Sequence, residues 1–218
     1  TQRDALLVNM LSLRRSRAGG AETFGLRLVA ALSSAWDGDI RVLVRQDTAG
    51  WLAGRHWAQG ELEPVRALGH GSASVPLTNL MAARGIAGSG ATVLSPFNIH
   101  TLGAPRAREV VTVQDLISFH YLDGRWGPLR PAERALYEVK ARLLARSVRR
   151  AAAVVVHLEA TREDLHRWVP GVDPSRVHVV HLGAGNAHPG PVPDVPESTG
   201  DRPYVLVVGS SDAPHKNL

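Results

Sequence analysis

The chain has 218 residues, of which 44% are hydrophobic, and its 25 lysine and arginine residues outnumber 20 aspartate and glutamate residues, a net charge of +5. This composition argues against a disordered polar segment, and the absence of cysteine excludes a disulfide framework, a thiol nucleophile and a thiolate metal site. No apolar run reaches the roughly 18 residues of a membrane span.

Short apolar runs alternate with helical patterns along most of the chain. The first half predicts strands at residues 5–9, 40–44 and 91–95, helices at 23–33 and 75–84, and an irregular stretch at 47–74. The second half predicts strands at 109–113, 152–158 and 176–182, a loop at 118–130, and helices at 131–150 and 161–169. Fully apolar strands that alternate with helices are typical of parallel strands buried on both faces. Residues 1–183 are therefore predicted to form one doubly wound α/β domain.

The two helices of the second half have distinct starting signals. Pro131 stands at the start of the first, where its missing N–H costs nothing. The helical period places one set of apolar residues on one side of that helix: Ala132, Leu136, Val139, Leu143 and Val148. Thr161 is predicted to cap the second helix, with Glu163 and Asp164 in its first turn.

The composition changes after Gly183. Residues 184–203 contain five prolines together with several glycines, and they are predicted to form an interdomain linker. Residues 204–218 resemble the first strand and loop of a second α/β unit. On this interpretation the chain is the first part of a longer protein.

Ligands of such sheets bind at the carboxyl ends of the strands, so the residues there are the site candidates. Gly19 and Gly20 follow the first strand and precede a helix whose N-terminus offers free N–H groups to an anion, and Glu22 stands beside them. The dinucleotide pattern GxGxxG is absent, and a plain tight turn is the alternative interpretation.

Two further strand ends carry polar side chains. Gln114 and Asp115 follow the strand at 109–113 and are predicted to point into the cleft, unless Asp115 only caps the next turn. Asn98 and His100 follow the strand at 91–95 and are candidates for the same crevice, with no role as the alternative. Lys216 follows the last glycine turn, where it can neutralise a phosphate.

No metal site is expected from the sequence. His178 and His181 lie close together near the end of a predicted strand, but no carboxylate or third ligand is placed with them. The phosphate-loop pattern GxxxxGK[ST] is also absent.

Basic residues are concentrated between residues 125 and 150. Eight lysine and arginine residues there stand against two glutamates, a local net charge of +6. The plain interpretation is a solvated helix face. The alternative is attraction to an anionic surface, either lipid headgroups or phosphorylated ligands. An aromatic content of 5% and the lack of a zinc-finger or RNA-binding signature argue against a nucleic-acid partner.

Five segments, taken in order, resemble the retaining GT-B glycosyltransferases of family 4. They are AGGAE, VVTVQDL, RRAAAVVVHLEATREDL, RVHVVHLGAG and, after the linker, YVLVVGSSDAPHKNL. The resemblance covers essentially the whole chain. It implies two Rossmann-like domains facing across a cleft, with an acceptor-side domain at 1–183 and the start of a donor-binding domain at 204–218. It also implies no bound metal and no cofactor, because the nucleotide-sugar donor is a substrate.

The resemblance assigns roles to residues at the matched positions. Gly19 and Gly20 match the glycine loop that lies against the donor phosphates or the acceptor, and Lys216 matches the lysine that contacts the donor diphosphate. Gln114 stands where family members commonly have histidine, and Asp115 is kept. These two are the predicted catalytic residues. The Gln114 side chain cannot act as a base, but it can hydrogen-bond a sugar hydroxyl.

The acceptor-side candidates are Glu22, Asn98 and His100. At two other positions the chain departs from the family pattern. Ser210 stands where an arginine is common, and Leu158 stands where a serine is common.

The sequence thus favours a retaining glycosyltransferase that transfers a sugar from a nucleotide-diphosphate sugar to a glycan, lipid or small-molecule acceptor. The full-length protein would be the enzyme, and the present fragment alone is expected to be inactive. Two alternatives remain open: a sugar-nucleotide epimerase of GT-B architecture and a non-catalytic α/β binding module. We expect a cytoplasmic location, with peripheral contact to an anionic membrane through the arginine-rich helix.

Overall fold

The computed structural model describes residues 5–13, 20–53, 61–66, 78–79, 82–83, 86, 90–99, 101, 104 and 108–183. The predicted linker at 184–203 and the predicted second unit at 204–218 lie outside the described residues. Gly19, His100 and Lys216 also lie outside them. The predictions made for these parts of the chain stay predictions.

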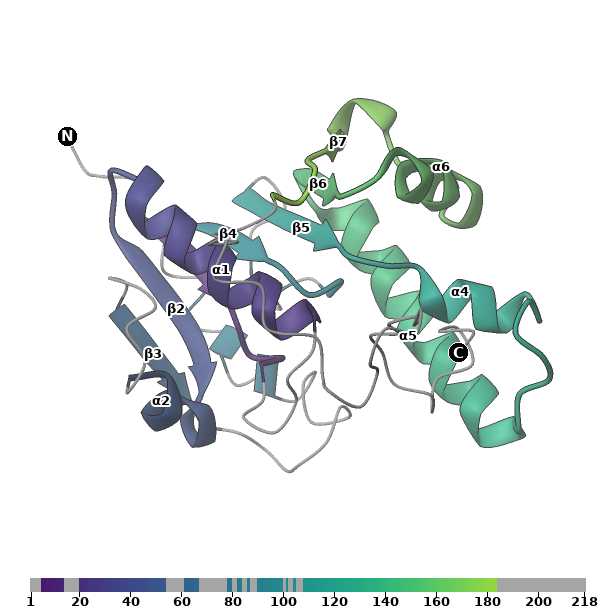
Figure 1. Ribbon diagram of the computed structural model, residues 1–218, viewed down its shortest axis with the longest axis horizontal. Coiled ribbons are helices and arrows are strands. Elements are labelled where there is room, and N and C mark those ends of the chain that lie inside the picture. Colours follow the sequence, from purple (N-terminus) through teal and green to yellow (C-terminus); the bar gives the residue numbers. More distant parts are fainter. Residues whose placement is uncertain are drawn as a thin grey trace, which may run out of the picture.

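The described residues form a seven-stranded sheet in the order β3-β2-β1-β4-β5-β6-β7 (Figure 1). All neighbouring strands pair in parallel. The strands are β1 (Leu6–Asn9), β2 (Ile40–Arg45), β3 (Glu61–Val65), β4 (Thr92–Ser95), β5 (Glu109–Val113), β6 (Ala153–Val156) and β7 (Val177–Val179). The predicted parallel α/β sheet is confirmed.

Helices cover both faces of this sheet. They are α1 (Gly20–Ala35), α2 (Gln46–Ala53), α4 (Ile117–Leu122), α5 (Pro131–Arg150) and α6 (Glu159–Trp168), with a short 3₁₀ helix η2 (Pro174–Arg176) before β7. Successive residues of β1 point to opposite sides, so Val8 packs with Val29 of α1 while Leu7 packs with Ile86 on the other face. In Figure 1, α1 crosses one face of the sheet. The doubly wound arrangement therefore follows from the alternation along each strand.

Helix α5 packs on the face opposite to α1. The strand registers align Leu7 with Val93 and Val93 with Glu109, which places Val111 on the same face as Leu7. Val111 belongs to a core cluster with Leu144 and Val148 of α5. Of the apolar side predicted for this helix, Val148 is fully buried, whereas Leu136 is 48% and Val139 is 50% exposed. The helix thus has apolar residues on two faces.

Two valines of α5 provide a matched test of this assignment. We expect Val148→Ala to lower the free energy of unfolding by about 2 kcal/mol, because it removes buried methyl groups and leaves a cavity. Val139→Ala, the same change on the exposed side, is expected to alter it by less than about 0.5 kcal/mol. Urea denaturation followed by circular dichroism measures both. Equal losses for the two variants would contradict the assigned faces.

The structure corrects three predictions of local structure. Residues 47–74 were predicted to be irregular, but they contain β3 and all of α2 except its first residue, Gln46. Strand β3 is an edge strand without a buried residue and contains Pro64, so it lacks an apolar alternation. Helix α4 occupies part of the predicted loop at 118–130. Helix α6 begins at Glu159 with Leu158 as its N-cap, so Thr161 is not the cap. The four residues described within the predicted helix 75–84 are helical.

Candidate functional site

The candidate site lies where the order of the strands reverses. From β1 the chain moves to β2 and β3 on one side, and β4 then starts the other half of the sheet. Ligands of open α/β sheets bind at such a switch point, beyond the carboxyl ends of the strands. Asn9 and Ser95 are the last residues of β1 and β4 and border this position.

Three of the predicted site residues meet at the carboxyl ends of β4 and β5, and we call them the Asn98 cluster: Asn98, Gln114 and Asp115. The Gln114 N–H donates to Asn98 Oδ1 at 2.7 Å, and Asn98 Nδ2 donates to the carbonyl of Asp115 at 3.5 Å. Gln114 Nε2 donates to the Pro96 carbonyl at 2.8 Å. The amide groups of Asn98 and Gln114 therefore hold the two loops together.

The backbone at Asn98 is itself unusual. Its φ of 60° lies in the left-handed region, which asparagine adopts more readily than most residues. The Asn98 N–H donates to the Thr112 carbonyl at 3.0 Å, so this conformation is fixed against β5. Asn98 acts as a connector between the two strand ends.

Asp115 also has a local structural role. Its Oδ1 accepts the N–H of Ile117 at 3.2 Å, at the first residue of α4. This bond corresponds to the turn-capping alternative raised from the sequence. The side chains of Gln114 and Asp115 are half-buried, and within the described part of the chain no donor reaches Gln114 Oε1. That oxygen and the Asp115 carboxylate are acceptors suited to hydroxyl groups of a ligand.

Helix α1 passes close to the loop that carries Asn98. A Cβ built at Gly25 would lie 2.7 Å from Phe97 Cζ and 2.8 Å from Met10 Cε, so only glycine fits without movement of these side chains. Gly20 and Glu22 precede Gly25 by five and three residues, about 5 to 8 Å along the helix axis. Gly20 is the first residue of α1, and a Cβ there would meet nothing within 4 Å.

A chain of buried polar groups lies beneath the Asn98 cluster. Asn9 Nδ2 donates to Thr101 Oγ1 at 2.6 Å, and Ser95 Oγ lies 2.7 Å from Thr101 Oγ1. Ser95 donates to Glu109 Oε1 at 3.0 Å, and the Thr101 N–H donates to the same oxygen. Because Ser95 gives its one proton to Glu109, Thr101 must donate to Ser95. The bonds therefore run from Asn9 through the Thr101 and Ser95 hydroxyls to the Glu109 carboxylate. We call Asn9, Ser95, Thr101 and Glu109 the buried polar chain.

Glu109 is fully buried, and its Oε2 has no hydrogen-bond partner among the described residues. Burial raises the pKa of its carboxyl to about 6, although the bonds from Thr101 and Ser95 and the charge of Arg150 act in the opposite direction. The buried polar chain spans β1, β4 and β5, and it fixes the loop from Ser95 to Thr101 that contains Asn98. Its role in the site is to hold that loop.

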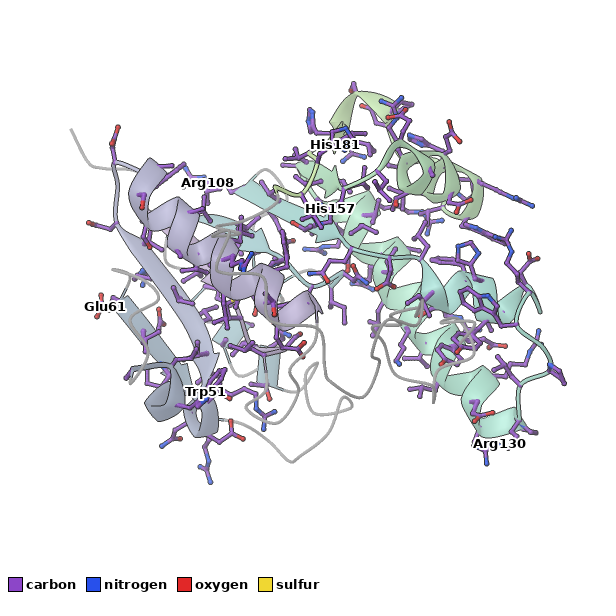
Figure 2. All side chains as sticks on the ribbon, in the orientation of Figure 1. Trp51, Glu61, Arg108, Arg130, His157 and His181 are labelled. Carbon is purple, nitrogen blue, oxygen red and sulfur yellow. The ribbon has the colours of Figure 1, made fainter. Side chains whose placement is uncertain are left out.

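His157 follows β6 on the same edge of the sheet. Its ring lies 4.8 Å from that of Phe24 of α1, centroid to centroid, in an edge-on arrangement. Nδ1 lies 3.1 Å from the Val180 carbonyl, so it carries the proton, and the buried Nε2 has no partner among the described residues. Figure 2 labels His157 beside His181, whose Nδ1 donates to the His157 carbonyl.

Sequence reasoning missed several of these groups. Glu109, His157 and Gly25 were not singled out, although a carboxylate that opens the apolar run EVVTV and a histidine that directly follows AVVV are unusual at such positions. Among the predicted residues, the structure brings Asn98, Gln114 and Asp115 together. The roles predicted for them stay predictions. No group of three histidine, aspartate or glutamate residues is placed to hold a metal ion in the described ranges.

The sheet order and the polar residues at the carboxyl ends of its strands define a Rossmann-like α/β chain. No protein-family model matches the sequence, and no curated protein sequence matches it significantly. Among solved structures, the chain is similar to sucrose-phosphate synthase from Thermosynechococcus elongatus, with a TM-score of 0.58 and 13% sequence identity. The match covers 83% of this chain and 48% of that chain, so this chain spans about half the length of that protein. At this identity the likeness shows the fold, without distinguishing family 4.

None of the helices in the described ranges is both long and apolar enough to cross a bilayer.

Proposed function

We propose that this chain is the acceptor-side part of a retaining GT-B glycosyltransferase of family 4, which transfers a sugar from a nucleotide-diphosphate sugar to a hydroxyl acceptor. One observation carries the proposal. The fold matches that of a sucrose-phosphate synthase, a GT-B glycosyltransferase, over 83% of the chain. The half-buried polar groups at the carboxyl ends of β4 and β5, next to the switch point of the sheet, support it.

In this reaction the bond between the sugar C1 and the donor diphosphate breaks, and a bond between C1 and the acceptor oxygen forms. The acceptor proton leaves with the diphosphate. Negative charge develops on that leaving group, so donors and cations fixed in advance lower the barrier. The N–H groups of the first turn of α1, which begins at Gly20, together with Gly19 and Lys216, are the groups assigned to it.

The acceptor is assigned to the Asn98 cluster. Gln114 Oε1 and the Asp115 carboxylate accept hydrogen bonds from its hydroxyl groups and orient the attacking oxygen. Glu22 and His100 contribute further contacts, and Asn98 holds the two loops in place. The nucleotide-sugar is consumed as a substrate, and the proposal includes no resident metal or cofactor.

The test is release of nucleoside diphosphate from a panel of UDP-, ADP- and GDP-sugars by the protein at its natural length. We expect release that depends on an added acceptor, with the anomeric configuration of the donor kept in the product, as read by NMR. Release of diphosphate without any acceptor, together with an altered free sugar, would favour an epimerase. Absence of both turnover and donor binding would favour a non-catalytic binding module.

A further inference from the structure

Helix α5 carries a second apolar stripe that the core does not use. Ala132, Ala135, Leu136 and Val139 follow the spacing i, i+3, i+4, i+7, which places them on one face of the helix. All four are exposed, and Leu136 and Val139 are among the most exposed large apolar side chains of the described residues. We call these four residues the outer stripe.

The core-facing side of α5 is already occupied. Tyr137 stacks on Tyr121 of α4 with ring centroids 4.4 Å apart, and Leu144 and Val148 are buried against the sheet. Because these contacts fix the rotation of the helix, the outer stripe cannot turn inward without their loss. In the view of Figure 2, Arg130 marks the end of α5 that lies away from the sheet.

Positive charge surrounds the outer stripe. Helix α5 contains six lysine and arginine residues against two glutamates, a net charge of +4. Glu138 is shared, because Arg134 lies 3.4 Å and Arg142 3.0 Å from its carboxylate oxygens. Arg146, which is exposed one turn beyond Arg142, forms no ion pair among the described residues. The two glutamates of α5 therefore do not neutralise the positive charge of this helix.

An exposed apolar stripe bordered by arginines has the chemistry of a helix that lies in a membrane interface. We propose that the outer face of α5 docks on the surface of an anionic lipid bilayer, with Leu136 and Val139 entering the headgroup region and Arg142 and Arg146 contacting lipid phosphates. Charge complementarity selects this partner. A second copy of the chain would present the same positive face and be repelled. The inference does not depend on the proposed enzymatic function.

Cosedimentation of the whole chain with vesicles tests the proposal. We expect binding to vesicles of phosphatidylcholine mixed with phosphatidylglycerol, little binding to phosphatidylcholine alone, and weaker binding as sodium chloride is raised. Equal binding to both vesicle types, or binding to neither, would overturn the proposal.

Two double variants locate the surface. Arg142→Gln with Arg146→Gln is expected to weaken binding to the mixed vesicles on the order of tenfold, whereas Arg162→Gln with Arg167→Gln on α6 leaves it unchanged. Leu136→Ser with Val139→Ser is expected to weaken it as well. Leu158→Ser with Val180→Ser, at positions that are 58% and 53% exposed, is its control.

Thermal melts of all variants show whether each still folds. The surface is assigned wrongly if the α5 variants bind the mixed vesicles as well as the unmodified chain does. It is also assigned wrongly if the two control double variants weaken binding as much as the α5 variants do. If sedimentation velocity shows self-association that only the α5 variants lose, the face is an interface between copies and the lipid proposal fails.

Discussion

Replacing Glu109 by alanine is expected to lower the free energy of unfolding by about 3 kcal/mol. The Thr101 N–H and the Ser95 hydroxyl both donate to Glu109 Oε1 in a fully buried position, so both lose their acceptor. The removed side chain also leaves a cavity beside the strands. Urea denaturation at neutral pH measures the loss. Glu163→Gln, at an exposed position on α6, is the control and is expected to change the free energy by less than about 0.5 kcal/mol.

Glu109→Gln separates the charge from the hydrogen bonds. The pKa of Glu109 is about 6 in the folded protein and 4.5 in the reference state, so the folded protein favours the protonated form. The stability that this shift contributes is fully present below pH 4.5 and is lost as the pH rises through 6. The unmodified chain should therefore lose about 2 kcal/mol of unfolding free energy relative to the glutamine variant when the pH is raised from 4.5 to 7.5.

The glutamine keeps an oxygen for Thr101 and Ser95, so this comparison does not require loss of the polar chain. Acidic groups whose pKa is lowered in the folded protein change the free energy of unfolding at lower pH than Glu109 does. A hydrogen bond from Arg45 lowers the pKa of the Asp47 carboxyl. The stability that Asp47 contributes is therefore lost only when the pH falls below the ordinary pKa of an aspartate. Parallel pH profiles for the glutamine variant and the unmodified chain would contradict the raised pKa of Glu109.

The sequence was sufficient for the strands that form the centre of the sheet. Runs such as LLVN and EVVTV are apolar because both of their faces are buried, and this signal is local. The edge strand β3 lacks it, because one of its sides is open and none of its residues is fully buried. Helix α4 was missed because it is only six residues long and follows directly from a strand-end turn.

The candidate site was predictable where topology alone determines it. The end of each parallel strand meets its neighbours at one edge, which is why Asn98, Gln114 and Asp115 could be named together. The buried polar chain was not predictable, because Asn9 lies 92 residues from Thr101 and the members of the chain meet only after the sheet has formed. The same holds for Gly25, whose close contact with Phe97 depends on how α1 crosses the sheet.

Two substitutions at Asn98 separate its backbone role from its side-chain role. Asn98→Ala is expected to lower the free energy of unfolding by about 2 kcal/mol, because alanine is disfavoured at a φ of 60° and the bonds to Gln114 and Asp115 are lost. Asn98→Gly loses the same bonds but adopts this φ without a penalty, so we expect a loss of only about 1 kcal/mol. Equal losses would show that the backbone conformation at Asn98 is not strained.

The activity of these variants is expected to follow a different order from their stability. If the Asn98 cluster orients the acceptor, then both variants should lower kcat/KM for sugar transfer about 100-fold, because Gln114 and Asp115 are no longer held in place. Gln114→Ala, which removes the free Oε1 itself, should produce a loss of similar size, and its combination with Asn98→Gly should add little, since the two residues act together. A glycine variant with full activity would show that the side-chain bonds of Asn98 only stabilise the loop. A large further loss in the double variant would show that Gln114 and Asn98 act independently.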